Sequence, residues 1–401
     1  MKIGILTFHS QLNYGGVLQC WALQTVLQQM GHEVVVIDRR LDDRRDIHRI
    51  CLPLPLTARL EKIVLSLRGA NDFAMRTRAI RTNRFITHAL HLTPYHFTEW
   101  GDAPSDLGID VLVVGSDQVW HCGNWGNPRP YLLENGPDIP SIAYAASLGM
   151  EKIPAESMES FAENLPRFTC VSVREASARL LLKPFRQDIA VTFDPTLLVG
   201  PKDWQKLCHR TKKTRRKLVC YFVDDGEDSF FDYLHQFATI HDYDVDVFMN
   251  LQHQGPVPLR KPWQLLKMYR NRFFSPVRIR YEAGPEDCVT AFCAADAVVT
   301  DSFHALMFAT IFGKNIRILQ PRQDWLAISF SRILEFSDEY IDGPLIQADL
   351  GKALASLERG EEIAFNDSAL GERIEDGKRW LKNALEKAML SHDVLRQMNK
   401  R

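Results

Sequence analysis

The turn over residues 300–304, with the sequence TDSFH, places a histidine where a helix begins. A β-branched run over residues 297–299 precedes it and predicts a buried strand. A helix start carries unpaired N–H groups and a partial positive charge, so it attracts anions. His304 can add a proton or a positive charge to a bound anion, and the Ser302 hydroxyl can hold its other end. In the alternative interpretation, Ser302 only caps the helix and His304 fills space.

Three further polar turns follow strand-like runs elsewhere in the chain. Their candidate ligand-binding residues are Asn13, Tyr14, Gly15, Gly16, Ser116, Asp117 and Arg174. Because ligands of parallel sheets bind beyond the carboxyl ends of the strands, we expect all four turns to face one crevice. Asp117 is a candidate base for a sugar hydroxyl, although it also fits a turn or N-cap residue. Trp120 offers an aromatic face to a sugar ring, with buried packing as its alternative role.

The elements that would position these turns alternate between strands and helices. Strand-like runs lie at residues 1–7, 34–38, 110–114, 142–146 and 170–173. A second alternation of strands and helices covers residues 218–223, 227–238, 245–249, 286–295, 297–300 and 316–319. This order predicts an α/β fold with parallel, doubly wound sheets. We predict domains over residues 1–199 and 200–365, followed by a C-terminal helix over 366–401.

Two features near strand ends receive a structural interpretation. The first loop has no G-x-G-x-x-G fingerprint, so we do not predict dinucleotide binding, although Asp38 ends the second strand. The pair Asp194-Pro195 ends a strand-like run, and we interpret it as a residue pair that orients the domain connection.

Composition limits the classes of function. The 401 residues carry a formal net charge of −1, and no nucleic-acid-binding motif is present, so we do not expect a nucleic-acid partner. The eight cysteines form no C-x-x-C pair, so we expect neither a zinc site nor another metal or cofactor. No signal-peptide core or membrane-spanning run is seen, and we expect a cytoplasmic protein.

Residues 39–91 differ in character from the rest. Between Arg39 and Arg84, twelve Lys or Arg residues stand against five Asp or Glu residues. The segment fits a solvated helical insertion, or a basic surface that rests on anionic lipid at the inner face of the cytoplasmic membrane.

Five motifs in this order resemble the polysaccharide pyruvyl transferase family. They are KIGILTFHSQLNYGGVLQCWALQ at the start, VLVVGSDQVW at 111–120, VSVREASA at 171–178, TFDPTLL at 192–198 and VVTDSFHALMFATIFGKNIRIL at 298–319. Their form is most similar to that of bacterial members from capsule and exopolysaccharide gene clusters. The resemblance implies two Rossmann-like domains facing across a cleft, as in GT-B glycosyltransferases. It also implies transfer of a pyruvyl group from phosphoenolpyruvate to two hydroxyls of one sugar.

The resemblance implies roles for particular residues as well. Arg174, after the VSVR-like strand, and His304, in the [S/R]-[F/L]-H turn, correspond to the family's donor site. Some members have arginine where this chain has Ser302. A further basic residue follows the next strand in the family, for which Arg322 is the nearest candidate and Lys314 the second.

Three functions are therefore weighed. The first is a pyruvyl (ketal) transferase that acts on a surface-polysaccharide precursor with a polyprenyl-diphosphate anchor. The second is a nucleotide-sugar-dependent glycosyltransferase of GT-B type in the same kind of pathway. The third is a non-catalytic assembly partner at the inner membrane surface, against which the presence of both Arg174 and His304 argues.

Overall fold

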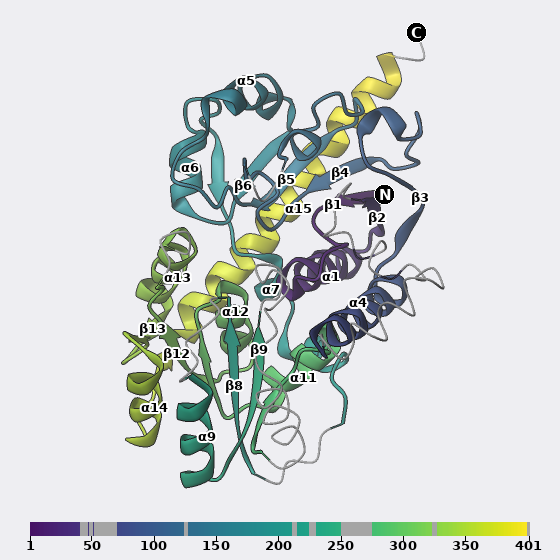
Figure 1. Ribbon diagram of the computed structural model, residues 1–401. Coiled ribbons are helices and arrows are strands. Elements are labelled where there is room, and N and C mark those ends of the chain that lie inside the picture. The colour runs from purple at the N-terminus through teal and green to yellow at the C-terminus, as the bar shows by residue number, and fades with distance from the viewer. Residues whose placement is uncertain are drawn as a thin grey trace, which may run out of the picture.

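Two parallel β-sheets divide the molecule into an N-terminal and a C-terminal lobe (Figure 1). The computed structural model describes residues 1–40, 47, 51, 70–123, 127–210, 215–223, 230–249, 275–322 and 327–398. Helices cover both sheets, and the lobes face each other across a cleft. The expected α/β architecture of two Rossmann-like domains is confirmed.

The N-terminal sheet has seven strands, all in parallel pairs. In spatial order they are β3 (Leu92–Phe97), β2 (Glu33–Arg39), β1 (Lys2–Leu6), β4 (Val111–Val114), β5 (Ser141–Ala146), β6 (Cys170–Val173) and β7 (Ile189–Val191). The sequence VLVV of β4 is fully buried, as a central strand of a sheet covered on both faces requires. The strands predicted for this half of the chain are confirmed.

The C-terminal sheet has six strands with the same parallel pairing. In spatial order they are β10 (Val277–Ile279), β9 (Tyr243–Met249), β8 (Arg216–Phe222), β11 (Ala297–Thr300), β12 (Asn315–Leu319) and β14 (Ile346–Gln347). A small antiparallel pair, β13 (Ile341–Asp342) with β15 (Ala364–Phe365), adjoins this lobe.

The helices connect the strands in both lobes. Those of the N-terminal lobe are α1 (Tyr14–Gln29), α4 (Ala70–Ala89), α5 (Ala155–Asn164), α6 (Ala176–Leu182), α7 (Pro195–Leu198) and α8 (Pro201–Gln205). Those of the C-terminal lobe are α9 (Phe230–Ile240), α11 (Pro285–Ala294), α12 (Phe303–Ile311), α13 (Ala327–Tyr340) and α14 (Leu350–Glu358). Three short 3-10 helices are η1 (Trp100–Asp102), η2 (Arg129–Leu132) and η3 (Leu165–Arg167).

The last helix, α15 (Asp367–Met398), returns from the C-terminal lobe to the N-terminal one (Figure 1). It contacts β4, β5 and β6 as well as α7. Its residue Gly377 packs closely, since a Cβ there would lie 3.2 Å from Leu198 and 3.4 Å from the Tyr144 hydroxyl. The chain therefore crosses between the lobes twice.

Part of the predicted basic segment takes part in the contact between the lobes. Most of residues 41–69 lie outside the described residues, but α4 is described and packs against α11. Arg78 is 2% exposed and donates hydrogen bonds to the backbone oxygens of Leu12 and Met249. Arg81 pairs with Asp287 at 3.2 Å. These two arginines therefore hold the lobes together, so α4 is not the solvated insertion that the sequence favoured. Contact of the segment with lipid stays a prediction.

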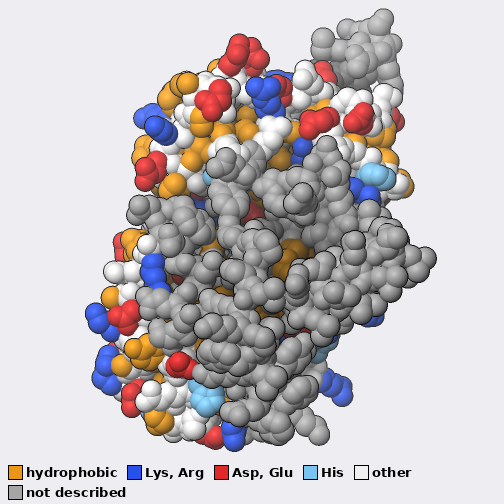
Figure 2. Space-filling model, viewed as in Figure 1, with side chains coloured by type: hydrophobic (Ala, Val, Ile, Leu, Met, Phe, Trp, Pro, Cys, Tyr) orange, Lys and Arg blue, Asp and Glu red, His pale blue; other side chains and the backbone are white. Residues whose placement is uncertain are grey.

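The described surface carries charges of both signs. In the view of Figure 2, basic and acidic side chains alternate over the upper lobe, as the net charge of −1 leads one to expect. Within the described ranges, none of the helices combines the length and apolar character needed to span a bilayer.

Candidate functional site

Asp194 is the point at which both lobes meet. It follows β7 and caps α7, where its Oδ1 accepts hydrogen bonds from the backbone N–H and the hydroxyl of Thr196 at 3.0 and 2.8 Å. Its Oδ2 accepts a hydrogen bond from the Ser116 hydroxyl at 2.9 Å. The carboxylate is 0% exposed and is therefore fixed from both sides.

Arg174 binds this carboxylate from the end of β6. Its Nη1 donates to Asp194 Oδ2 at 2.9 Å, and its Nη2 lies 3.8 Å from Asp117 Oδ1. The guanidinium also lies over the ring of Phe303, 4.6 Å from its centroid, so the C-terminal lobe contacts it too. The buried Nε has no hydrogen-bond acceptor, which leaves one donor available to a ligand.

His304 approaches the same carboxylate from the start of α12. Its Nε2 lies 3.8 Å from Asp194 Oδ2 and makes no hydrogen bond. The opposite side of the ring lies against Gly15, where an added Cβ would come within 2.6 Å of His304 Cγ. A Cβ on Gly16 would lie 3.3 Å from Asp117 Oδ2. The two glycines at the start of α1 therefore allow the imidazole and the Asp117 carboxylate to lie close to the backbone.

Asp194, Arg174, Asp117 and His304 form a cluster of charged and polar side chains. A second arginine from α13 lies beside them. Arg332 is 4% exposed, and its Nη1 donates to the Ser147 hydroxyl at 3.2 Å. With its amide oxygen turned toward this arginine, Gln118 accepts from Nη1 and Nη2 at 3.1 and 2.7 Å. Ser147 in turn donates to Glu175 Oε1 at 2.7 Å. Arg332 therefore binds neutral partners directly and reaches a carboxylate only through a hydroxyl.

Burial shifts the protonation of these groups. It lowers the pKa of His304 below the usual 6.5, because Asp194 and Asp117 compensate only in part. Burial also lowers the pKa of Arg332 to about 10, with Glu175 opposing the shift. For Asp194, burial acts to raise the pKa, but the positive charges of His304 and Arg174 outweigh it and hold the pKa below its usual value. The cluster thus contains two guanidinium cations, the ionised Asp194 carboxylate and a histidine that is mostly neutral at pH 7.

A small cavity opens beside the cluster. Arg174, Glu175 and Asp194 line it from the N-terminal lobe, and Phe303, Arg332 and Glu335 line it from the C-terminal lobe. Its volume is about 60 Å³, well below the roughly 300 Å³ at which ligand pockets usually begin. A ligand of several atoms is therefore larger than this cavity.

Most of the predicted site residues come together at the cleft. Ser116, Asp117, Arg174, Gly15, Gly16 and His304 all contact this cluster. Asn13 caps α1, where its side chain accepts a hydrogen bond from Gly15 N–H at 3.0 Å. Ser302 occupies the N-cap position of α12, but its side chain makes no capping hydrogen bond there. The expectation that the four turns share one edge agrees with these contacts.

Trp120 takes its alternative role in buried packing, and Tyr14 is buried as well. Trp120 is 0% exposed, and its indole N–H donates to the backbone oxygen of Tyr131, so its ring is part of the N-terminal core. Tyr14 is 2% exposed, and its hydroxyl donates to the backbone oxygen of Ala283 across the lobes. Both rings belong to the packing that positions the site, since no face of either is accessible to a ligand.

The two basic candidates after α12 stand at opposite ends of β12. Lys314 precedes β12, so it stands at the edge of the sheet opposite to His304, and its Nζ donates to the backbone oxygen of Cys293 at 2.8 Å. Lys314 is therefore excluded as a residue that binds the donor substrate at this cluster. Arg322 follows β12 on the correct side of the sheet, and its side chain is exposed.

Sequence reasoning missed three members of the cluster. Asp194 was interpreted as a structural residue, although its place after a strand-like run was the same signal that selected Asp117 and Arg174. Glu175 adjoins Arg174 in sequence and lies 3.7 Å from its Nε. Arg332 carries no such signal, because it lies in the middle of a helix and is brought in by the packing of α13.

Comparison with known proteins gives one family and one fold. The family model for polysaccharide pyruvyl transferase matches residues 13–319. No curated protein gives a significant match. Solved structures match over nearly the whole chain at low sequence identity, so they bear on the fold.

The first of these is a putative UDP-N-acetylglucosamine 2-epimerase from Listeria monocytogenes. It is 10% identical with a TM-score of 0.51, over 96% of this chain and 95% of that one. The UDP-GlcNAc 2-epimerase from Neisseria meningitidis bound to UDP-GlcNAc is 10% identical with a TM-score of 0.47, over 96% and 100%. The calicheamicin glycosyltransferase is 14% identical with a TM-score of 0.40, over 100% and 98%.

Proposed function

The chain belongs to the polysaccharide pyruvyl transferase family, and on that premise we propose that it transfers the pyruvyl group of phosphoenolpyruvate to two hydroxyls of one sugar. The product is a cyclic ketal, and inorganic phosphate is released. The observation that carries the proposal is the meeting of Arg174, Arg332 and His304 at the cleft, around the buried Asp194. These groups suit a substrate that is anionic and must accept a proton.

The two arginines would hold the donor. Phosphoenolpyruvate carries a carboxylate and a phosphate, with about three negative charges near neutral pH. Arg174 Nε makes no hydrogen bond, and Arg332 donates to neutral groups, namely the Ser147 hydroxyl, the Gln118 amide oxygen and the Ile328 backbone oxygen. Both guanidinium groups can therefore donate hydrogen bonds to an anion while at most one ion pair is broken. A guanidinium binds carboxylate or phosphate oxygens through two parallel hydrogen bonds. In this chain Arg332 would supply the charge that an arginine at position 302 would otherwise provide.

His304 would deliver the proton. In the free protein the imidazole is mostly neutral, but an anion bound beside it favours the imidazolium form. The imidazolium then gives its proton to the methylene carbon of the enol, and the double-bond electrons form the new C–H bond. The neighbouring carbon becomes an oxocarbenium-like centre, and the Asp194 carboxylate stabilises the positive charge of the imidazole before transfer.

Asp117 would act on the acceptor. One sugar hydroxyl attacks the oxocarbenium carbon and gives its proton to a base, for which Asp117 is the candidate. A second hydroxyl of the same sugar then attacks this carbon as the bond to the phosphate oxygen breaks. Its proton passes to the departing phosphate, and the ketal ring closes. The positive φ of Asp117, 68°, turns its backbone sharply at the end of β4 and brings its carboxylate toward Gly16.

The acceptor is a sugar of a surface-polysaccharide precursor, of the capsule or exopolysaccharide type in a bacterium. A polyprenyl-diphosphate anchor and action at the cytoplasmic face of the membrane are part of the proposal. Their support is the excess of basic residues between Arg39 and Arg84, twelve against five. Arg84 is exposed on α4, whereas Arg78 and Arg81 are engaged in the contact between the lobes.

Ligand-induced stabilisation tests the proposal directly. The thermal midpoint of the purified protein is measured with phosphoenolpyruvate, UDP, GDP and inorganic phosphate, and again in His304→Ala and Arg174→Ala. A ligand at one hundred times its Kd adds about 2.7 kcal/mol to the free energy of unfolding, which is readily seen. We expect stabilisation by phosphoenolpyruvate above that by phosphate, and its loss in both variants.

Turnover provides the second measurement. Incubation with phosphoenolpyruvate and a galactose- or mannose-containing acceptor should release phosphate and add the mass of a ketal-linked pyruvyl group. Stabilisation by UDP or GDP alone would instead favour a nucleotide-sugar glycosyltransferase on this fold. Full activity of either variant would refute the assignment of the site.

A further inference from the structure

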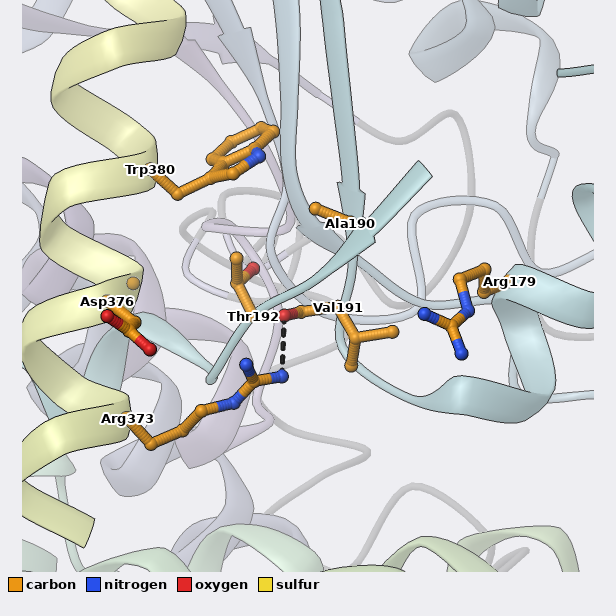
Figure 3. Close-up of a pocket in the computed structure, with 8 residues that line it drawn as sticks. Arg179, Ala190, Val191, Thr192, Arg373, Asp376 and Trp380 are labelled. Carbon is orange, nitrogen blue, oxygen red and sulfur yellow. Dashed lines mark hydrogen bonds between the residues drawn. The ribbon is translucent and has the colours of Figure 1, made fainter. Parts of the chain in front are cut away.

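A second, larger pocket lies at the outer edge of the N-terminal sheet (Figure 3). Its volume is about 260 Å³, and it lies between the end of β7, helix α6 and helix α15. We call it the β7 pocket. Strand β7 is the last strand of its sheet, so backbone groups on its outer side are free of strand partners and accessible to other donors and acceptors.

Two arginines give the β7 pocket its charge. Arg179 reaches it from α6 and Arg373 from α15, on either side of β7 (Figure 3). Arg373 Nη2 donates to the Val191 backbone oxygen at 2.7 Å, which fixes this guanidinium at the pocket wall. The carboxylate in the lining, Asp376, is already paired with Arg379 at 2.9 Å. The positive charge of the lining therefore exceeds the negative charge, and the pocket suits an anionic group.

Trp380 gives the same pocket an aromatic wall. The side chain stands on α15 one turn beyond Asp376, and its ring centroid lies 6.0 Å from that of Tyr144 (Figure 3). Indole faces stack on the apolar faces of pyranose rings, while carboxylate and guanidinium groups bind hydroxyls and acidic substituents. A pocket slightly below the usual range for drug-sized ligands fits one such ring.

The β7 pocket adjoins the small cavity beside Arg174 and Asp194, which we call the donor cavity. Val191, Thr192 and Arg373 line both. A ring in the β7 pocket would therefore be separated from the donor cavity by this shared wall alone. A glycan chain that passes around this wall can therefore present one sugar to the β7 pocket and another to the donor cavity.

We propose that the β7 pocket binds an acidic hexose of the same acceptor glycan that carries the sugar receiving the pyruvyl group. The carboxylate of this hexose pairs with Arg179 and Arg373, and its ring stacks on Trp380. The inference rests on the proposed function for the reacting sugar, but binding of the acidic hexose itself does not require the donor.

Saturation-transfer NMR and calorimetric titration test this binding without phosphoenolpyruvate. The probes are galacturonic acid, galactose and inorganic phosphate. Galacturonic acid should bind more tightly than either of the others, since it alone combines the ring with the carboxylate. Equal binding of galactose would overturn the role of the arginines, and equal binding of phosphate would overturn the role of the ring.

Arg179→Gln is the informative variant, because the side chain is exposed and lies outside the donor cavity. It should weaken galacturonic acid binding about tenfold or more, the usual effect of losing a hydrogen bond to a charged group. Lys183→Gln is the matched control, since it removes the same charge at the end of α6 without lining the pocket. Unchanged binding in Arg179→Gln, or equal losses in both variants, would overturn the proposal.

The two proposals fail separately in this design. Arg179→Gln should keep the stabilisation by phosphoenolpyruvate while it loses galacturonic acid binding. Stabilisation by phosphoenolpyruvate without galacturonic acid binding would refute the proposal for the β7 pocket and leave the proposed transferase activity standing. Galacturonic acid binding that depends on Arg179, with no stabilisation by phosphoenolpyruvate, would refute the proposed transferase activity. The β7 pocket would then stand as a binding site for acidic sugars.

Discussion

The imidazole of His304 lies against the backbone of Gly15, so the start of one lobe's first helix determines where the other lobe's histidine can stand. A Gly15→Ala side chain would lie 2.6 Å from His304 Cγ, and the ring would have to move. Because alanine is a better helix former than glycine, the variant should keep its fold. We expect loss of stabilisation by phosphoenolpyruvate and a fall in kcat/KM of at least about tenfold.

Gly371→Ala is the control for this variant. Gly371 lies in α15, and a Cβ there meets nothing within 4 Å. Gly371→Ala should only raise the free energy of unfolding, through the higher helix propensity of alanine, and should leave kcat/KM unchanged. Equal activity of the two alanine variants would show that the contact between Gly15 and His304 has no effect on the reaction.

Removal of the Asp194 charge should destabilise the protein strongly. Asp194→Asn leaves the buried Arg174 without its closest anion, and breaking a buried pair in this way costs about 3–5 kcal/mol. Urea denaturation followed by circular dichroism measures the loss. Glu375→Gln breaks an exposed pair with Lys378 on α15 and should cost less than about 1 kcal/mol. Similar losses in both variants would show that Asp194 is not the centre of the contact.

The reaction should accelerate as the pH falls. The pKa of His304 is below 6.5, so little imidazolium is present in the free protein at neutral pH. Since the protonated form is the one that donates, kcat/KM should rise from about pH 8 toward about pH 6. Phosphate release across this range gives the profile. The same slope in residual His304→Gln activity would assign the rise to another group.

Stability should change in the opposite direction. Below about pH 6.5 the unfolded chain binds a proton at this histidine more readily than the folded protein, so the free energy of unfolding falls until the lower folded pKa is reached. Urea denaturation at about pH 7.5 and about pH 6 measures this loss. His304→Gln should lose less stability over this interval than the parent protein, and equal losses would contradict the lowered pKa.

Arg332 should contribute to donor binding. Arg332→Met keeps an unbranched apolar stem on α13 but removes the charge. We expect KM for phosphoenolpyruvate to rise roughly 10- to 100-fold, the equivalent of one or more hydrogen bonds to a charged group. Arg332→Lys should recover part of this loss, because it restores the charge without the two parallel donors. An unchanged KM in Arg332→Met would instead favour Arg322 as the second basic residue that binds the donor.

A different carboxylate should govern acid stability. Burial acts to raise the pKa of Asp38, but His9 and Arg40 lower it to about 2. A carboxyl whose pKa drops from 3.8 to about 2 adds about 2 kcal/mol of stability above its unfolded pKa, and this is lost as the pH falls toward about 2. Asp38→Asn should therefore be less stable at neutral pH and have a shallower acid denaturation curve. Parallel curves would contradict the ion pairs.

The sequence predicts the sheet edges well because hydrophobic runs and polar turns are local signals. The run before His304 is found as β11, Ala297–Thr300, and the histidine does stand at the first turn of α12. Arg174 and Asp117 were selected by the same rule, and both lie beside Asp194 or its partner. Parallel pairing alone brings such positions to one edge.

Other features depend on packing that no local pattern encodes. Trp120 follows a strand end as Asp117 does, but its ring fills the core beside Phe161 and Phe168. Arg332 reaches the cleft only because α13 packs against the opposite lobe, where Glu335 accepts the backbone N–H of Ala176 at 2.9 Å. Asp38 has the position of a ribose-binding acid, yet it is engaged with His9 and Arg40.

The return of α15 to the N-terminal lobe restricts how the cleft can open. Two bodies that the chain links at two places rotate most easily about the line through both links, once contacts such as those of Arg78 and Arg81 are released. Such a hinge separates the far rim of the cleft while residues near the axis, among them α7 and its cap Asp194, move least. Donor loading would then be a gated step, in which Arg332 and His304 swing away with their lobe and return once the anion is bound.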